Sequence, residues 1–223
     1  MKISNLKKNF EKFSLNIESL DIPEGKIYGI IGPNGCGKTT AMKMMAGVTP
    51  PDSGTIDYEG LSSRDITMAL RKPYLINDTV LHNLVYPLKL RKIKPDTKLV
   101  EHFLEITGLQ KYRDEHALVL SGGEQQKLAL ARALIFSPKL IFIDEAFSNM
   151  DIESVAFFEN YILEMQKSKP ITWVIISHQL SNIRRLCEYV FFMNDGEVNA
   201  SGLTDSILTS PDNDKIRQYL QYV

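Results

Sequence analysis

A glycine-rich motif near the N-terminus constrains the fold of this chain more than any other feature. Residues 32–39 read Gly-Pro-Asn-Gly-Cys-Gly-Lys-Thr and fit the pattern G-x-x-x-x-G-K-[ST] in full. The apolar run at residues 27–31 precedes the motif as a predicted buried strand, and residues 39–46 follow it as a predicted helix that ends at Gly47. Because a loop of this kind lies between a strand and a helix, the motif predicts an α/β unit.

Short apolar runs alternate with amphipathic stretches along most of the chain, which predicts an α/β fold with a largely parallel sheet. The runs at residues 140–143 and 172–176 are unbroken apolar segments, as expected for strands that are covered on both faces. The other predicted elements are a strand at 54–58, a helix at 152–166, a strand at 189–193 that enters a hairpin at 194–196, and one terminal helical stretch at 203–223.

The middle of the chain differs in character. Residues 78–113 contain no convincing β alternation, and their apolar side chains recur at helical spacing. Residues 70–131 are therefore predicted to form a mostly helical insertion, with residues 1–69 and 132–223 forming the α/β core. The apolar positions with this spacing are Leu81, Leu84, Val85 and Leu88, followed by Val100, Phe103, Leu104 and Leu109.

Composition narrows the class of protein further. Lys plus Arg number 26 and Asp plus Glu 27, so the net charge of −1 gives no sign of a nucleic-acid partner. No apolar run approaches the ~20 residues of a spanning helix, and two cysteines, Cys36 and Cys187, are too few for a disulfide framework. We expect a soluble, intracellular protein that needs a partner to work at a membrane.

The chemistry of the glycine-rich loop indicates a nucleoside triphosphate. Its glycines let successive backbone N–H groups face phosphate oxygens, and the helix behind them adds a favourable dipole. Lys38 can reach the β- and γ-phosphates, and the Thr39 hydroxyl can ligate Mg²⁺. A glycine-rich turn that binds nothing has no need of Lys-Thr at this place, so we expect the loop to bind a nucleoside triphosphate.

Cys36 occupies a variable position of this loop. We expect its small side chain to fill space rather than to serve a redox role. Because a helix N-terminus lowers the pKa of a nearby thiol, we also expect that Cys36 can be alkylated with loss of nucleotide binding, and that ATP protects it.

Two further motifs carry chemistry. Asp144 and Glu145 end an apolar strand, where Asp144 can hold Mg²⁺ through water and Glu145 can orient or deprotonate an attacking water. The alternative is that the two acids merely cap a helix. Residues 121–124, Ser-Gly-Gly-Glu, precede an amphipathic helix and form a second anion-binding helix N-terminus, or else an ordinary capping motif.

The order and spacing of these motifs resemble the ATP-binding-cassette (ABC) ATPase family over nearly the whole chain. The glycine-rich loop matches the family's Walker A motif, residues 120–125 its signature motif, and residues 141–145 its Walker B motif. Residues 148–151 match the D-loop, and His178 matches the switch histidine. The resemblance implies a RecA-like P-loop NTPase core with an N-terminal antiparallel β portion and a helical subdomain at 70–131 that carries the signature motif.

The resemblance also assigns roles to single residues. Phe10 falls where the family stacks an aromatic ring on adenine, with Phe13 and a plain core position for Phe10 as open alternatives. Catalysis is implied for Glu145, His178 and Lys38, and Mg²⁺ ligation for Thr39 and Asp144. The implied ATP-binding residues besides Phe10 are Gly32, Asn34, Gly35, Cys36, Gly37, Lys38, Thr39, Thr40, Ser121, Gly122, Gly123 and Glu124.

For partners, the resemblance implies a head-to-tail dimer with a second copy or a paralogous cassette, each ATP lying between one chain's Walker A and the other's signature motif. It implies a permease subunit that holds the cytoplasmic chain at the inner face of the cell membrane, most simply for transport of a small solute. Two other functions stay open: a soluble ABC ATPase that remodels or regulates another partner, and a binding module without turnover. Intact Glu145 and His178 disfavour the last.

One position departs from the family pattern in a way that bears on coupling. Arg71 stands where the family has a glutamine that touches Mg²⁺ and senses the membrane partner, and no Gln occurs between Thr40 and Leu109. Arginine has donors only, so it cannot ligate a metal ion. We expect altered coupling rather than lost hydrolysis. The residues expected to line the groove for the membrane partner, unless they pack inside the helical subdomain, are Tyr74, Leu75, Val80, Leu81 and Leu84.

Overall fold

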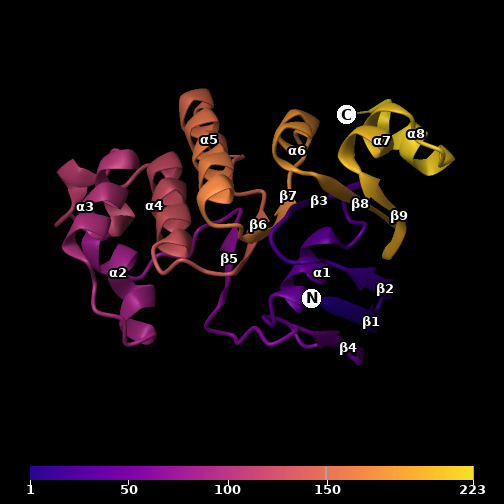
Figure 1. The fold of residues 1–223 in the computed structure, drawn as a ribbon, viewed down its shortest axis with the longest axis horizontal. Helices are drawn as coiled ribbons and strands as arrows, with labels where there is room; N and C mark the ends of the chain where they lie inside the picture. The colour runs from indigo at the N-terminus through magenta and orange to yellow at the C-terminus, as the bar shows by residue number, and fades with distance from the viewer. Residues whose placement is uncertain (149, 223) are drawn as a thin grey trace.

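The computed structural model describes residues 1–148 and 150–222. Its centre is a 6-stranded sheet with the strand order β5-β6-β7-β3-β8-β9, parallel except for the antiparallel pair β8 and β9 (Figure 1). This confirms the predicted α/β fold with a largely parallel sheet. The strands are β3 (Ile27–Ile31), β5 (Ile66–Leu70), β6 (Leu140–Asp144), β7 (Thr172–Ile176), β8 (Tyr189–Asn194) and β9 (Glu197–Leu203).

A second, 3-stranded antiparallel sheet covers one face of the central sheet (Figure 1). Its order is β2 (Phe13–Asp21), β1 (Lys2–Phe10) and β4 (Ser53–Asp57), and α1 (Lys38–Met45) lies between the two sheets. Leu6, Leu15 and Met42 are fully buried against Phe142 of the central sheet, in one continuous apolar core. The N-terminal antiparallel β portion that the resemblance implied is therefore present.

Helices α5 (Ile152–Ser168) and α6 (Leu180–Leu186) cover the opposite face of the central sheet (Figure 1). Beyond the edge strand β5 lie α4 (Gly122–Leu134), α2 (Val80–Leu90) and α3 (Thr97–Ile106), with the short 3₁₀ turns η1 (Gln110–Tyr112) and η2 (Ala117–Val119) between α3 and α4 in the chain. Trp173 and Phe192 of the sheet are fully buried against Phe158 of α5 in a second core. Among the described residues, no helix has the length and apolar character needed to cross a membrane.

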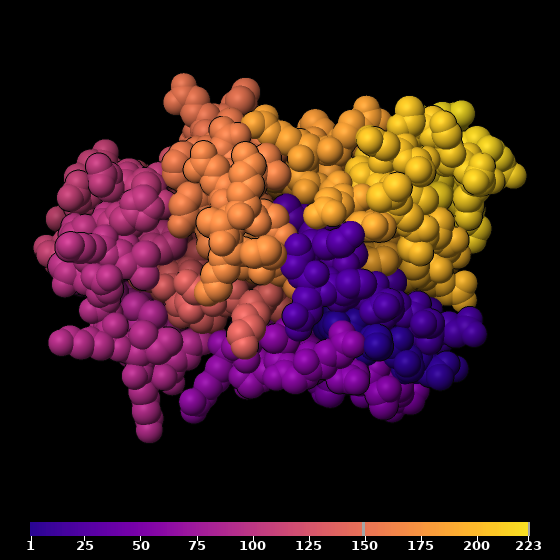
Figure 2. Space-filling model, viewed as in Figure 1, coloured from indigo at the N-terminus to yellow at the C-terminus, as the bar shows by residue number. Residues whose placement is uncertain are grey.

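The helical stretch in the middle of the chain forms one end of the molecule. Figure 2 shows it as a magenta lobe at the left, away from the yellow C-terminal part. Thr79 caps α2 by accepting the His82 amide, and Asp96 caps α3 in the same way through Lys98. The helical prediction for this region is confirmed, whereas its limits as a subdomain at 70–131 stay a prediction.

The end of the chain differs from its prediction. Instead of one helical stretch over 203–223, β9 runs to Leu203, and two short helices follow, α7 (Thr204–Thr209) and α8 (Asp214–Leu220). Ser210 and Pro211 separate them, because proline offers no N–H to continue a helical ladder. Val223 lies outside the described residues. The prediction of a single terminal helical stretch is wrong.

Candidate functional site

The strand order gathers three loops at one edge of the central sheet. Strands β3, β7 and β6 are neighbours and parallel, so the segments that follow them lie side by side. These segments are the glycine-rich loop, the pair Ser177–His178, and the pair Asp144–Glu145. Ligands of open α/β sheets bind outside the carboxyl ends of such strands.

The shape of the glycine-rich loop requires glycine at particular positions. Gly37 has φ 102 and forms the N-cap of α1, and a Cβ there would lie 2.8 Å from the ring of Phe13. Lys38 is 7% exposed, and its Nζ donates to the carbonyls of Gly32 at 2.7 Å and Pro33 at 2.8 Å. Burial lowers the pKa of Lys38. The loop thus holds a desolvated ammonium group beside the N-terminus of α1, where an anion is favoured.

A cavity of about 420 Å³ opens above this loop. Its polar floor comes from the loop, its far wall from Glu145 and His178, and its apolar rim from Phe10 and Phe13. Phe10 is half-exposed at 48%, and the two ring centroids are 6.2 Å apart. The predicted residues that line the cavity are Phe10, Asn34, Gly35, Gly37, Lys38, Thr39, Thr40, Glu145 and His178.

Thr39 and Asp144 form the candidate Mg²⁺ site. The Thr39 hydroxyl donates to Asp144 Oδ1 at 3.1 Å, and Asp144 is 5% exposed. Burial raises the pKa of Asp144, against the hydrogen bond from Thr39, which lowers it. The described residues hold no cluster of three or more metal-ligating side chains. A hydroxyl and one carboxylate nevertheless fit Mg²⁺, because this ion keeps several waters and takes its other ligands from substrate phosphates.

Glu145 is held from two sides. His178 Nε2 lies 2.6 Å from Glu145 Oε1, and Arg71 Nη1 lies 3.1 Å from Glu145 Oε2. The backbone of Glu145 adopts φ 52 directly after β6, and its N–H donates to Ile176 O of β7 at 3.0 Å. This turn aims the carboxylate at the cavity that also holds Lys38. The structure therefore brings two of the three predicted catalytic residues, Glu145 and His178, into contact, with the third, Lys38, on the same cavity. It also places Arg71, the residue that departs from the family pattern, against Glu145.

The Ser-Gly-Gly-Glu motif lies elsewhere. Ser121 caps α4, and Glu124 completes a capping box in which its Oε2 accepts the Ser121 N–H at 2.9 Å and the Ser121 hydroxyl at 2.7 Å. Those bonds lower the pKa of Glu124. None of Ser121, Gly122, Gly123 and Glu124 lines the cavity above Lys38. Both interpretations of the motif therefore fit the structure of a single chain. The motif caps α4, and it leaves the N-terminus of that helix exposed.

Three other predictions need correction or qualification. Cys36 is 5% exposed, and burial raises the pKa of its thiol, with nearby Lys38 acting in the opposite direction. The prediction that a helix N-terminus lowers this pKa is therefore wrong, because desolvation outweighs it. Cys36 and Gly32 do not line the cavity, so only their backbone groups remain candidates for nucleotide contact. Of residues 148–151, Asn149 lies outside the described residues.

A second, apolar groove of about 310 Å³ separates the end of β5 from α2 and α4. Tyr74, which is 76% exposed, lines it together with Pro73 and Leu90. The other four residues predicted for the groove, Leu75, Val80, Leu81 and Leu84, do not line it, so the groove prediction is wrong for them and the alternative, packing inside the helical part, holds. Val80 and Leu84 are fully buried on the inner face of α2, and Leu75 and Leu81 pack against the same core.

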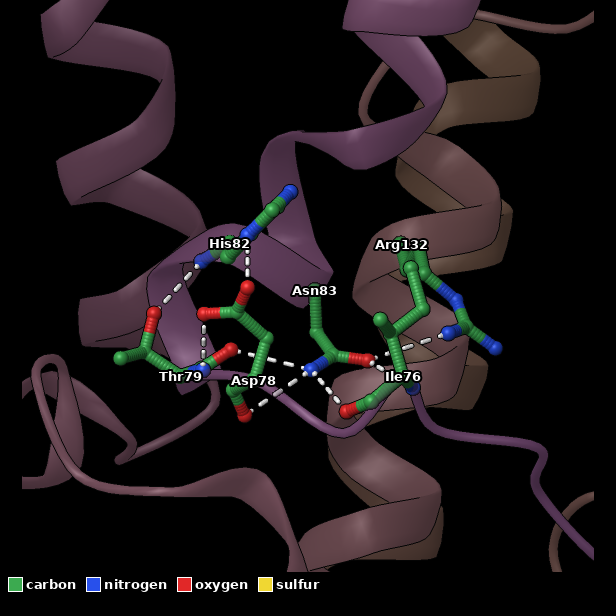
Figure 3. A network of polar contacts seen from close by, with 6 residues as sticks. All are labelled: Ile76, Asp78, Thr79, His82, Asn83 and Arg132. Atoms are coloured by element: carbon green, nitrogen blue, oxygen red, sulfur yellow. Dashed lines mark hydrogen bonds and ion pairs between the residues drawn. The ribbon is translucent and has the colours of Figure 1, made fainter.

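Sequence reasoning missed a buried polar network beside this groove (Figure 3). Asn83 is fully buried on α2, accepts the Ile76 N–H at 2.8 Å, and donates to the carbonyls of Ile76 and Thr79, both at 3.0 Å. Arg132 of α4 donates to Asn83 Oδ1 at 3.3 Å and also to Tyr74 O. Helical spacing gave no signal for it, because Asn83 points away from the predicted apolar positions Leu81, Leu84, Val85 and Leu88.

Comparisons with known proteins bear on the family to which the chain belongs. The model of the ABC transporter family matches residues 15–148. The tungstate uptake system ATP-binding protein TupC of Peptoclostridium acidaminophilum is 37% identical over 203 residues, which are 88% of this chain and 95% of that protein. The probable sulfate/thiosulfate import ATP-binding protein CysA of Chlorella vulgaris is 30% identical over 232 residues, covering 98% of this chain and 97% of that protein.

A solved structure supports the fold. A dimeric ATP-binding cassette in a post-hydrolysis state, bound to ADP and Pi, superposes with a TM-score of 0.80 at 24% identity, over 91% of this chain and 98% of that one. The layered arrangement of a central sheet, an N-terminal antiparallel sheet and a helical end is thus that of an ATP-binding cassette.

Proposed function

The chain belongs to the ABC transporter family as an ATP-binding subunit, and we propose that it hydrolyses ATP at the cavity above Lys38. The observation that carries this proposal is the juxtaposition, around one cavity, of Lys38, Glu145 and His178 beside the pair Thr39 and Asp144. A cation, a candidate base and a candidate metal site at one edge of a sheet are the parts that phosphoryl transfer to water requires.

Each side chain then has a defined task. Lys38 exchanges its carbonyl partners for the β- and γ-phosphates, and the loop N–H groups bind the same oxygens. Thr39 and Asp144 would hold Mg²⁺, which when bound would neutralise charge on the phosphates. Glu145 accepts a proton from the attacking water, while His178 orients the other oxygen of the same carboxylate. Phe10 stacks on adenine at the rim of the cavity.

Two copies of the chain, or one copy and a paralogous cassette, complete the site by pairing head to tail. The support is that Ser121, Gly122, Gly123 and Glu124 form a helix N-terminus outside the chain's own cavity. Placed against the γ-phosphate held by a partner's Lys38, this helix end contributes contacts that exist only while that phosphate is present. Hydrolysis removes these contacts, so the dimer opens.

On this proposal, the closing and opening of the dimer drive a permease subunit, which anchors the chain at the cytoplasmic face of a membrane. The apolar groove beside Tyr74 is the docking place that we assign to it. The relatives named above act in tungstate uptake and in sulfate/thiosulfate import. We therefore propose that this chain also serves the uptake of a small solute, and oxyanions are the solutes to test first.

Phosphate release tests the enzymatic part. The purified chain should release phosphate from ATP with Mg²⁺, and Lys38→Ala and Glu145→Gln should each lower turnover by about 100-fold or more. Glu188→Gln is the matched control, because this carboxylate pairs with Lys26 on the surface, at the opposite end of the sheet. Wild-type turnover in the Glu145→Gln variant would remove Glu145 as the base.

Recovery of the chain from detergent-solubilised membranes tests the partner. Co-purification with a membrane-spanning protein is the expected result. Recovery with a non-membrane partner only would favour the alternative, an ABC ATPase that remodels or regulates other proteins.

A further inference from the structure

Both oxygens of the candidate base already have partners in this chain. His178 Nε2 contacts Oε1 at 2.6 Å, and Arg71 Nη1 contacts Oε2 at 3.1 Å. Glu145 is 11% exposed, whereas Arg71 is 64% exposed. A water that gives its proton to Glu145 must therefore compete with a cation for the same carboxylate.

Arg71 sits in a short free stretch between two anchors. Upstream, Gln126 of α4 donates to Leu70 O at 3.0 Å, and downstream, Arg132 of the same helix donates to Tyr74 O. Residues 71–73 have no helical or strand structure. Across residues 1–148 and 150–222, the Arg71 side chain makes one polar contact, with Glu145. This stretch can therefore move while its flanks stay fixed on α4.

The same stretch borders the apolar groove. Leu70, Pro73 and Tyr74 line the groove on both sides of Arg71. A protein segment that enters the groove thus presses directly on the residues that carry the arginine. Within the described residues, the ion pair between Arg71 and Glu145 is the only polar contact from residues 71–73 to the hydrolytic cavity.

From this geometry we infer that Arg71 is a positioning residue that restrains Glu145 in the free chain and releases it when the groove is occupied. The inference rests on the proposed function, since it says how docking of the permease subunit in this chain's groove would control Glu145 as the base. Arg71 neutralises the carboxylate and occupies one oxygen. Displacement of residues 71–73 withdraws the guanidinium and leaves Oε2 free for water. Because Arg71 is exposed, the restraint is weak enough for a docking segment to remove.

The direction of the rate change separates this inference from a direct catalytic role. Arg71→Gln should raise the basal turnover of the isolated chain about two- to fivefold, the factor that an exposed ion pair supports. Arg71→Lys should stay near the wild-type rate, and Lys72→Gln is the matched control, because it removes the adjacent exposed cation. In the complex co-purified with the permease, wild type and Arg71→Gln should turn over equally, because the restraint is already released. A basal rate that falls or stays constant in Arg71→Gln would overturn the inference.

Hydrogen exchange gives a second readout without nucleotide. If Glu145 anchors Arg71, Glu145→Gln should speed exchange of the Arg71 and Lys72 amides about two- to fivefold, whereas Glu188→Gln should leave it unchanged. Unchanged exchange in Glu145→Gln refutes the anchoring. A wild-type chain that hydrolyses no ATP defeats the proposed function instead, and the exchange experiment still decides whether Arg71 is held by Glu145.

Discussion

Asn83 is the residue whose removal should most clearly loosen the segment between the hydrolytic site and the apolar groove. Its side chain fixes both the N–H and the carbonyl of Ile76 and the carbonyl of Thr79, at 2.8, 3.0 and 3.0 Å (Figure 3). Asn83→Ala deletes these bonds and leaves Arg132, whose pKa burial lowers, without one of its acceptors.

The expected cost follows from the bonds lost. At about 1 kcal/mol net for each of the three short bonds, Asn83→Ala should destabilise the chain by about 3 kcal/mol. A chain of this length shifts its Tm by about 2–4 °C per kcal/mol, so the predicted drop is about 6–12 °C. Ile76 is half-buried, so water replaces part of what is lost, and the lower end of that range is expected.

Thermal unfolding of the nucleotide-free chain, followed by circular dichroism, measures the change. Asn160→Ala is the matched control, because exposed Asn160 makes one side-chain bond, to Arg185 at 2.8 Å, and should change stability by about 0.5 kcal/mol or less. A drop for Asn83→Ala no larger than that of the control would refute the reasoning that this network holds the segment.

Three other predictions concern residues at the cavity or beside it. Burial raises the pKa of Asp144; the folded chain therefore keeps that proton to higher pH than the unfolded chain, and stability falls as pH rises from the ordinary carboxyl range upward. Asp144→Asn should accordingly raise the Tm of the nucleotide-free chain at neutral pH, by an amount that shrinks towards about pH 5, and an unchanged or lower Tm at neutral pH would contradict this. Cys36 is buried and burial raises the pKa of its thiol, so maleimide should label it slowly in the folded chain with or without ATP. Rapid labelling of the folded chain would contradict the burial of this thiol. Phe10→Ala should weaken ATP binding about tenfold in a fluorescent-nucleotide titration, in line with a stacking contribution of about 1–3 kcal/mol, whereas Phe13→Ala, which uncovers Gly37, should mainly lower stability; the reverse pattern would assign the adenine to Phe13.

The strands that hold the site were predictable because the residues within each strand are enough to indicate that it is buried. Residues 27–31, 140–144 and 172–176 are buried along their whole length, and their unbroken apolar runs indicated this. The strand β5 was not predicted, since Thr67 and Met68 interrupt its pattern and its pairing with β6 spans a large sequence separation. Edge strand β9 likewise carries mostly polar or small residues, so residues 197–202 received no assignment, and its last residue, Leu203, was placed at the start of the predicted helical stretch.

Part of the candidate site was likewise predictable from local sequence, and part depends on tertiary contacts. The glycine-rich loop and the acidic pair were recognisable because the spacing of their residues carries the chemistry. The pair of Arg71 with Glu145 joins the ends of two neighbouring strands, and that neighbourhood depends on the strand order rather than on any local pattern. The Asn83 network is equally tertiary, because Arg132 approaches it from a different helix.

The direct test of the central claim, ATP hydrolysis between two paired cassettes, is size-exclusion chromatography with light scattering on Glu145→Gln. With ATP and Mg²⁺ this variant should elute as a stable dimer with little turnover, and it should be monomeric with ADP, because the contacts across the interface need the γ-phosphate. A monomer that retains full ATPase activity under the same conditions would contradict both the assignment of Glu145 and the paired arrangement.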